Sequence, residues 1–295
     1  MGVGYALLAM LSFATNIIIT RYAVARLPVE AGFFVVLATN VLFPAAIFAV
    51  ELGVRAEPYA WHWSGAGLFA IGGVVGTFLG RRFLFDTVKL LGPSRASVFH
   101  STAPAFALIA AWLLAGEILG PYELALMALV WFGLWLTQPR AGSLQAVAPE
   151  VLRKGLAAGL LTVAGFGFGN VLRGLAMREW HEAALGTVIA SVAAFACQVV
   201  VTRNWPRIAA QLRGADRTAL ALYTGCGVFT SLGSIFISLA MTRIEIALAV
   251  LVVHTTPLVI FPVSVFLLKH REELNARTVL GAALVLAGIA FLLLR

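Results

Sequence analysis

The sequence predicts an all-α, multi-pass membrane protein of ten transmembrane helices, arranged as two inverted five-helix repeats around a central cavity. Three observations support this fold: an apolar composition, ten uncharged stretches of membrane-spanning length, and features that recur after 153 to 155 residues. The chain is 61% hydrophobic and 12% charged, with a mean hydropathy of +0.96. Soluble domains are about half apolar and a quarter charged. A water-soluble fold has too little interior to bury so much apolar surface, so we expect the surrounding solvent to be lipid.

The expected spans are the windows that contain no ionised side chain. In chain order they are 1–20, 31–50, 58–80, 96–116, 124–139, 155–172, 183–202, 218–242, 246–268 and 278–294. Each is about long enough for a helix to cross a hydrocarbon layer of ~30 Å at ~1.5 Å per residue. Helices are expected because backbone amides in lipid must be satisfied within their own segment. The windows 124–139 and 155–172 should extend past their flanking charges, whose long side chains reach the interface.

Internal repetition predicts two copies of a five-helix unit. Shifting the sequence by 153 to 155 residues superposes, in order, Asn16 on Asn170, Gly72 on Gly225, Thr77 on Thr230, Gly80 on Gly233, Pro104 on Pro257, Glu117 on Glu272 and Gly133 on Gly288. We therefore expect repeats at 1–139 and 154–295, joined by a linker at 140–153. Five helices are an odd number, so the second copy enters the membrane from the opposite side. Inverted repeats are typical of secondary transporters.

The same segments resemble a known family. Residues 91–136 look like the fourth and fifth helices of an EamA domain, with a proline inside the fourth helix, Gly-Glu at its end and a glycine-rich fifth helix. Residues 244–294 repeat this pattern, except that Lys269-His270-Arg271 precedes Glu272. Two such domains in tandem resemble the ten-helix branch of the drug/metabolite transporter superfamily, which includes the YddG-type amino-acid exporters. The resemblance implies transport of small metabolites and places the fourth and ninth helices beside the cavity.

The stretch "VLVVHTTPLVIFP", residues 250–262, interrupts an apolar run with polar groups. Proline removes a backbone hydrogen bond and opens the carbonyl four residues earlier, so Pro104 and Pro257 are expected hinges. Side chains near these prolines can face the cavity; they are His100, Ser101, Thr102, His254, Thr255 and Thr256. The alternative is that the hydroxyls bond their own helix and His254 is an interhelical contact.

Other intramembrane polar residues extend the candidate site. Asn16, Asn40 and Asn170 lie well inside spans, where an unsatisfied amide is costly, and they either line the pathway or bind neighbouring helices. Basic side chains lie at the ends of the spans. The arginines expected at the cavity mouths are Arg21, Arg81, Arg82 and Arg173. All thirteen acidic residues fall outside the spans or at their margins, which disfavours lipophilic cations as substrates. Amides, hydroxyls and imidazoles suit a neutral or zwitterionic solute, whose carboxylate can meet an arginine.

Three function classes follow. The first is an alternating-access secondary transporter that exports amino acids or related zwitterions, with protons as possible co-substrates. The second is a carrier of anionic metabolites, such as sugar phosphates or nucleotide sugars, bound by Arg81, Arg82, Arg173 and Arg243. The third is an intramembrane enzyme or a structural membrane protein; we expect no enzyme, because neither paired carboxylates nor a metal cluster is evident.

The expected partners are a small-molecule substrate and the lipid bilayer. Basic residues sit singly between helices, which excludes a nucleic-acid face. No G-x-x-x-x-G-K-[ST] loop occurs, so no ATPase is expected as the driver. The cysteines, Cys197 and Cys226, have no metal-ligand spacing, and no cofactor or metal is expected. The sequence leaves the oligomeric state open, and a monomer is compatible with the fold.

The basic residues also predict the orientation in a cell membrane, which in a bacterium is the inner membrane. With a cytoplasmic N-terminus, the cytoplasmic side would hold five basic residues, and the other side the remaining sixteen. Basic residues favour the cytoplasm. We therefore expect both termini outside, with 81–95, 140–154, 203–217 and 269–277 inside. Relatives of the YddG type have the opposite orientation.

Overall fold

The structure is a computed structural model that describes residues 1–55, 60–91, 96, 99, 102–137, 148–256, 258–260 and 276–293. All regular secondary structure in these residues is helical. By length and composition, six helices in the described ranges are long and apolar enough to cross a membrane. The predicted all-α, multi-pass membrane class is confirmed.

Helices lie in all ten expected windows. The long ones are α1 (Gly2–Ala23), α2 (Val29–Val54), the continuous run of α3 (Trp63–Gly72), π-helix η1 (Gly73–Gly80) and α4 (Arg81–Leu91), then α8 (Pro149–Glu179), α9 (Ala183–Val201) and α11 (Arg217–Met241). The other four windows contain α6 (Ala103–Ala115), α7 (Pro121–Thr137), α12 (Ile246–Val253) and α14 (Ala276–Leu293). These four helices have 8 to 18 residues, so ten spans stay a prediction. A further short helix, α10 (Trp205–Arg213), was not expected.

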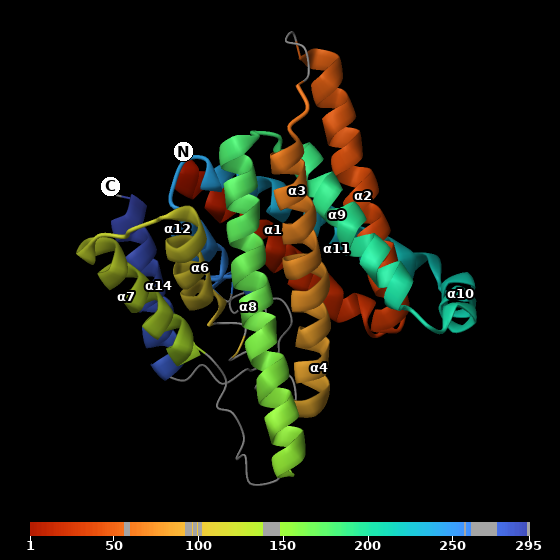
Figure 1. Cartoon of the computed structure of the whole chain (residues 1–295). Coiled ribbons are helices and arrows are strands. Elements are labelled where there is room, and N and C mark those ends of the chain that lie inside the picture. Colours follow the sequence, from red (N-terminus) through yellow and green to blue (C-terminus); the bar gives the residue numbers. More distant parts are fainter. Residues whose placement is uncertain are drawn as a thin grey trace. The chain divides into compact units, whose positions relative to one another are not determined.

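The chain forms two compact units. Unit 1 comprises Met1–Val74 and Leu172–Arg243, and unit 2 comprises Val75–Val171 and Ile244–Arg295. Each unit takes helices from both halves of the sequence (Figure 1). The two units are defined by how densely their residues pack, and packing density does not show whether the sequence is repeated. The repeats at 1–139 and 154–295 therefore stay a prediction.

In unit 1, α11 packs against α1, α2 and α9, and α9 also packs against α2 and α3. Close approach depends on small residues: a Cβ at Gly227 of α11 would lie 2.4 Å from the Cβ of Thr39 in α2. A second contact zone, between α3, α8 and α9, has Phe69, Met177 and Trp180 at its centre. Both zones bury apolar or small side chains. This composition suits helices in lipid, which associate through close packing because the hydrophobic effect does not act between them.

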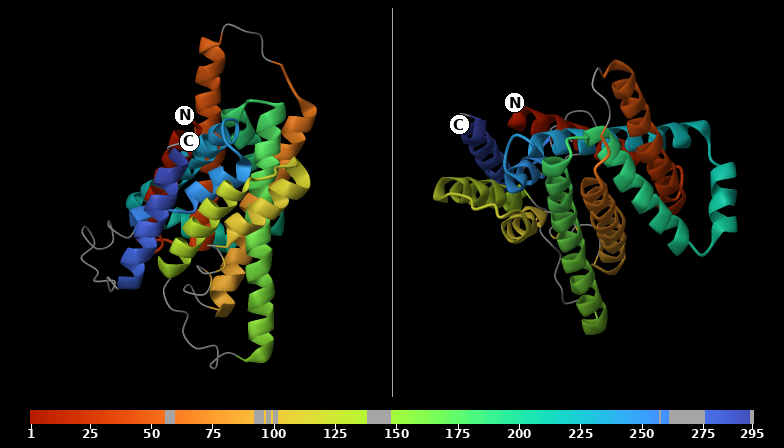
Figure 2. Two further views of the ribbon diagram at one scale, coloured as in Figure 1. Left: turned by 90° about the vertical axis from the view of Figure 1, so that its left-hand side faces the viewer. Right: turned by 45° about the horizontal axis from the view of Figure 1, so that its top comes forward.

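In unit 2, α7 lies beside α14, and α12 packs against α6 and α7 (Figures 1 and 2). The segment "GFGFGN", 165–170, lies in α8, where its glycines allow close helix packing. A Cβ at Gly165 would lie 2.9 Å from the Cα of Gly80, and one at Gly167 would lie 2.9 Å from the backbone of Ala107. The glycines therefore let α8 approach η1 and α6 backbone to backbone.

Candidate functional site

The ninth expected span is broken at His254–Thr256. α12 ends at Val253, and the next three residues form a turn before helical structure resumes at 258–260. Thr255 and Thr256 donate their backbone N–H groups to the carbonyls three residues earlier, at 3.1 and 3.3 Å. Pro257 itself lies outside the described residues. A proline at 257 cannot donate to the Val253 carbonyl, which explains why the helix tightens and stops here.

The three polar side chains of this turn bond back to the carbonyls of their own helix. His254 Nδ1 lies 2.8 Å from the Val250 oxygen. The hydroxyls of Thr255 and Thr256 each donate at 2.6 Å, to the oxygens of Val252 and Val253 respectively. Residue 257 is a proline and has no N–H, so the Val253 oxygen lacks the donor that a regular helix would supply. It accepts from the Thr256 hydroxyl instead. These contacts match the alternative in which the polar groups serve their own helix.

The contact of His254 assigns its tautomer. A carbonyl oxygen can only accept, so Nδ1 carries the hydrogen, and Nε2 of the neutral ring is an acceptor. Nδ1 of the ring is hydrogen-bonded to the Val250 oxygen. Nε2 is the other ring nitrogen and is the atom that can accept a further proton.

The fourth expected span carries the same device. Thr102 donates its hydroxyl to the Phe99 oxygen at 2.7 Å and its backbone N–H to the same oxygen at 2.9 Å. Thr255 makes the corresponding bond 153 residues later, and each threonine precedes its proline by two residues. α6 begins directly after this turn, so Pro104 lies in its first turn, where no N–H is needed. Thr102 is therefore a turn residue directly before the helix that contains Pro104, and the hinge at Pro104 stays a prediction. His100 and Ser101 lie outside the described residues.

The two breaks belong to helices that pack together in unit 2. α6 contacts α12, and every residue of α12 is at most 7% exposed. Thr255 and Thr256 are also buried, whereas His254 is half-buried.

Glu117 holds the opposite end of α12. α6 ends at Gly116, whose φ of 63° is a left-handed conformation that favours glycine. The chain then places the buried carboxylate of Glu117 against α12, where it accepts from the N–H groups of Ile246 at 2.9 Å and Ala247 at 3.4 Å. Sequence reasoning used Glu117 only as a marker of the repeat. The signal for this role was the Gly-Glu pair directly after a helix.

The other candidates in unit 2 stand on α8 and α4. Asn170 is half-buried in α8, and its side chain makes no hydrogen bond to another residue in the described part of the chain. Arg81 and Arg82 begin α4, where Arg81 is half-buried and Arg82 exposed.

The remaining candidates lie in unit 1. Asn16 accepts from the Thr20 hydroxyl at 3.4 Å. Asn40 is 3% exposed, and with its amide nitrogen facing α11 it donates to the Gly227 oxygen at 2.8 Å and the Ser231 hydroxyl at 3.2 Å. Helix packing therefore accounts for Asn40, and its role in the cavity stays a prediction. Arg21 is exposed in the last turn of α1, and Arg173 is half-buried in α8.

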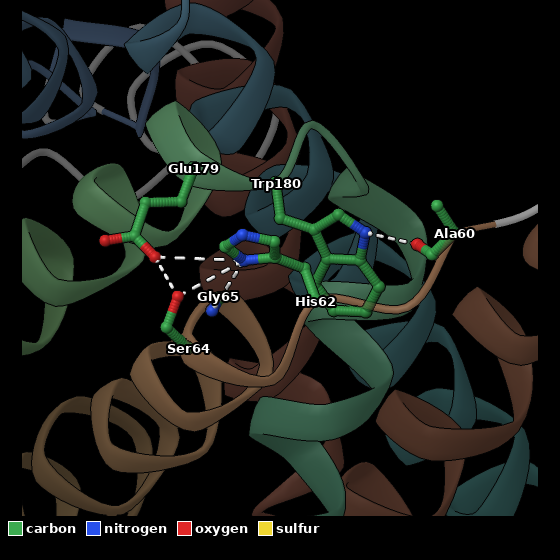
Figure 3. A network of polar contacts seen from close by, with 6 residues as sticks. All are labelled: Ala60, His62, Ser64, Gly65, Glu179 and Trp180. Atoms are coloured by element: carbon green, nitrogen blue, oxygen red, sulfur yellow. Dashed lines mark hydrogen bonds and ion pairs between the residues drawn. The ribbon is translucent and has the colours of Figure 1, made fainter.

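A further polar network in unit 1 joins the start of α3 to the end of α8 (Figure 3). His62 Nδ1 lies 3.2 Å from the Ser64 hydroxyl, 3.3 Å from the Gly65 nitrogen and 3.9 Å from Glu179. Ser64 donates directly to the Glu179 carboxylate, and Trp180 Nε1 donates to the Ala60 oxygen at 3.2 Å. A hydrolytic triad needs the imidazole between the hydroxyl and the carboxylate. Here the hydroxyl and the carboxylate lie against the same ring nitrogen, Nδ1, and bond each other directly, so the network joins the two helix ends.

Comparisons with known proteins place the chain among membrane transporters. A family model described as "EamA-like transporter family" matches residues 1–138 and 153–294. A solved structure, described only as "Crystal structure of protein", is 18% identical, with a TM-score of 0.71 over 98% of this chain and 99% of that one. At this identity the likeness shows the fold alone. No curated protein sequence matches the chain significantly.

Proposed function

Because the chain belongs to the EamA-like transporter family, a family of membrane transporters, we propose that it is an alternating-access secondary transporter of small metabolites. The proposed substrate is an amino acid or a related zwitterion, and the proposed direction is export. Two inverted five-helix repeats around a central cavity form the proposed framework.

The observation that carries this proposal is a pair of turns, one at Thr102 directly before α6 and one at His254–Thr256 directly after α12. Carriers built from inverted repeats bind substrates and ions near the membrane midplane, at helices whose backbone is interrupted. In this chain the carbonyls of Phe99, Val252 and Val253 at the breaks are each bonded by a threonine hydroxyl. An ammonium group of a substrate can replace a hydroxyl as the donor, since each carbonyl oxygen has two lone pairs. The hydrogen bonds that these threonines make to their own helices are thus compatible with a role in substrate binding.

The polar groups around the breaks favour a zwitterion over a cation. Thr102, Thr255, Thr256 and His254 supply hydroxyl and imidazole groups and no carboxylate. Arginines at helix ends can meet the carboxylate of the solute. The second candidate, an anionic metabolite, is favoured by Arg173, which is half-buried in α8.

Proton coupling is proposed through His254. Its Nδ1 is held by the Val250 oxygen at 2.8 Å, so protonation would occur at Nε2. Protonation would turn Nε2 from an acceptor into a donor, which changes what this end of α12 can bind.

A substrate panel in proteoliposomes tests the proposal. The full-length protein is reconstituted and given radiolabelled amino acids, sugar phosphates and lipophilic cations, each with and without an imposed proton gradient. We expect saturable uptake of at least one amino acid class, and no uptake in protein-free liposomes. Uptake restricted to sugar phosphates or nucleotide sugars would establish the second candidate, and uptake of lipophilic cations alone would contradict both.

A further inference from the structure

α10, Trp205–Arg213, is a short helix of unit 1 between two candidate spans. It connects α9 to α11, both of which are long and apolar enough to cross a membrane (Figure 1). At ~1.5 Å per residue α10 is about 14 Å long and cannot cross the bilayer itself. It therefore lies where the chain leaves the hydrocarbon layer and turns back.

One side of α10 is fixed against unit 1. Ile208 is 4% exposed, and the ring of Trp205 lies 5.0 Å from that of Phe34 in α2. The Asn204 side chain accepts from the Arg207 N–H at 3.3 Å and caps the first turn. A capped helix with a docked apolar side presents its other side in one defined orientation.

The other side of α10 and its flanks are basic and exposed. The exposed cations are Arg203, Arg207, Arg213 and Arg217. The only acidic residue between 202 and 217 is Asp216, which caps α11 and pairs with Arg26 at 3.0 Å. None of the four arginines forms an ion pair with a carboxylate of the described residues. The surface thus has a positive charge that the described part of the protein leaves uncompensated.

We propose that α10 and these four arginines form a binding surface for the headgroups of anionic phospholipids. A basic amphipathic helix in the interface plane attracts anionic lipids, and guanidinium groups match phosphate geometry. Trp205, which is 41% exposed, has the side chain type that prefers the headgroup level. The surface goes beyond the proposed transport function, because none of these residues belongs to the helix breaks.

Native mass spectrometry of the full-length protein tests this surface. The protein, in a neutral detergent, is titrated with dioleoyl-phosphatidylglycerol or dioleoyl-phosphatidylcholine, and bound lipids are counted at each concentration. We expect tighter binding of phosphatidylglycerol by the parent. Each arginine at a charged surface contributes about fivefold, so Arg207→Gln/Arg213→Gln should weaken the preference by roughly 25-fold. Arg207→Lys/Arg213→Lys, which keeps the charge, should retain most of it.

The matched control is Arg153→Gln/Arg178→Gln, which removes two exposed arginines outside α10. It should leave the preference for phosphatidylglycerol unchanged. The proposal is overturned if the parent binds both lipids equally, or if the control pair loses as much as the α10 pair. It is also overturned if millimolar inorganic phosphate displaces the lipid, because the site would then bind a soluble anion.

Discussion

Thr102 and Thr255 show how single side chains can hydrogen-bond backbone carbonyls where a helix is interrupted inside a membrane. Each donates its hydroxyl to the carbonyl three residues earlier, at 2.7 and 2.6 Å. An unsatisfied carbonyl in an apolar surrounding costs on the order of 1–3 kcal/mol. The same carbonyls also accept the backbone N–H of the threonine, at 2.9 and 3.1 Å, so each hydroxyl adds a second hydrogen bond to the turn.

Replacing Thr255 by valine removes the hydroxyl and keeps the branched shape. We expect a loss of about 1 kcal/mol of stability and a clear fall in the initial rate of transport. Thr187→Val is the control, because Thr187 makes the same kind of bond, at 2.8 Å, inside the unbroken helix α9. Thermal unfolding and proteoliposome uptake measure the two effects. Equal uptake by both variants would show that the break has no role in transport.

His254→Gln keeps a side chain that hydrogen-bonds but cannot gain a proton. If transport is proton-coupled through His254, this variant should lose the pH dependence of uptake while it retains part of the substrate binding. His254→Leu should lose both. His62→Gln, in the network at the start of α3, is the control and should keep the parent pH profile. A glutamine variant with an unchanged pH profile would make His254 structural, and His100 would be the next residue to test.

At the scale of elements, α12 is a short rigid piece held at both ends. Its first two N–H groups are bonded by Glu117, and its last carbonyls by the turn at His254–Thr256. Eight residues span about 12 Å at ~1.5 Å per residue. A displacement at one end of α12 is therefore passed to the other.

Glu117→Ala should release the first turn of α12. Loss of a helix cap costs about 1 kcal/mol, and we expect lower thermal stability together with slower transport. Glu117→Gln keeps the acceptor oxygen and should be intermediate. Glu30→Ala, which removes an exposed glutamate in the first turn of α2, should leave transport unchanged. Parent-like uptake by Glu117→Ala would contradict a positioning role.

Pro257→Ala allows a backbone bond to the Val253 oxygen and should favour a continuous ninth span. We expect normal membrane insertion, retained substrate binding and slower transport. Pro44→Ala is the matched control, because Pro44 lies inside the long helix α2. Transport by Pro257→Ala at the parent rate would rule out the hinge at this position.

At the scale of the molecule, helices from the first half of the sequence pack against helices from the second half within each unit. α2 packs against α9, α6 against α12, and α7 against α14. In the predicted repeat these are the second and seventh, fourth and ninth, and fifth and tenth spans. This pairing is what a two-fold relation between the halves would produce, and it supports the repeat, which stays a prediction.

The orientation of the whole chain is the fifth prediction. The excess of basic residues on one side predicts both termini outside the cytoplasm. An alkaline phosphatase fusion after Arg295 should be active, and a green fluorescent protein fusion at the same place should be dark. A fluorescent fusion with an inactive phosphatase would reverse the orientation.

The sequence alone determined the membrane class, the presence of helices in the ten uncharged windows and the family resemblance, but not the short helix α10. These depend on local properties, because an uncharged window long enough for a bilayer must be helical wherever it packs. The prolines at 104 and 257 predicted hinges, and the described residues have turns two residues before each, at Thr102 and Thr255. The sequence did not reveal that Glu117 caps α12, that Asn40 binds α11, or that His62, Ser64 and Glu179 tie α3 to α8. The tertiary structure decided these contacts, since each joins residues more than 100 positions apart and depends on which helices pack side by side.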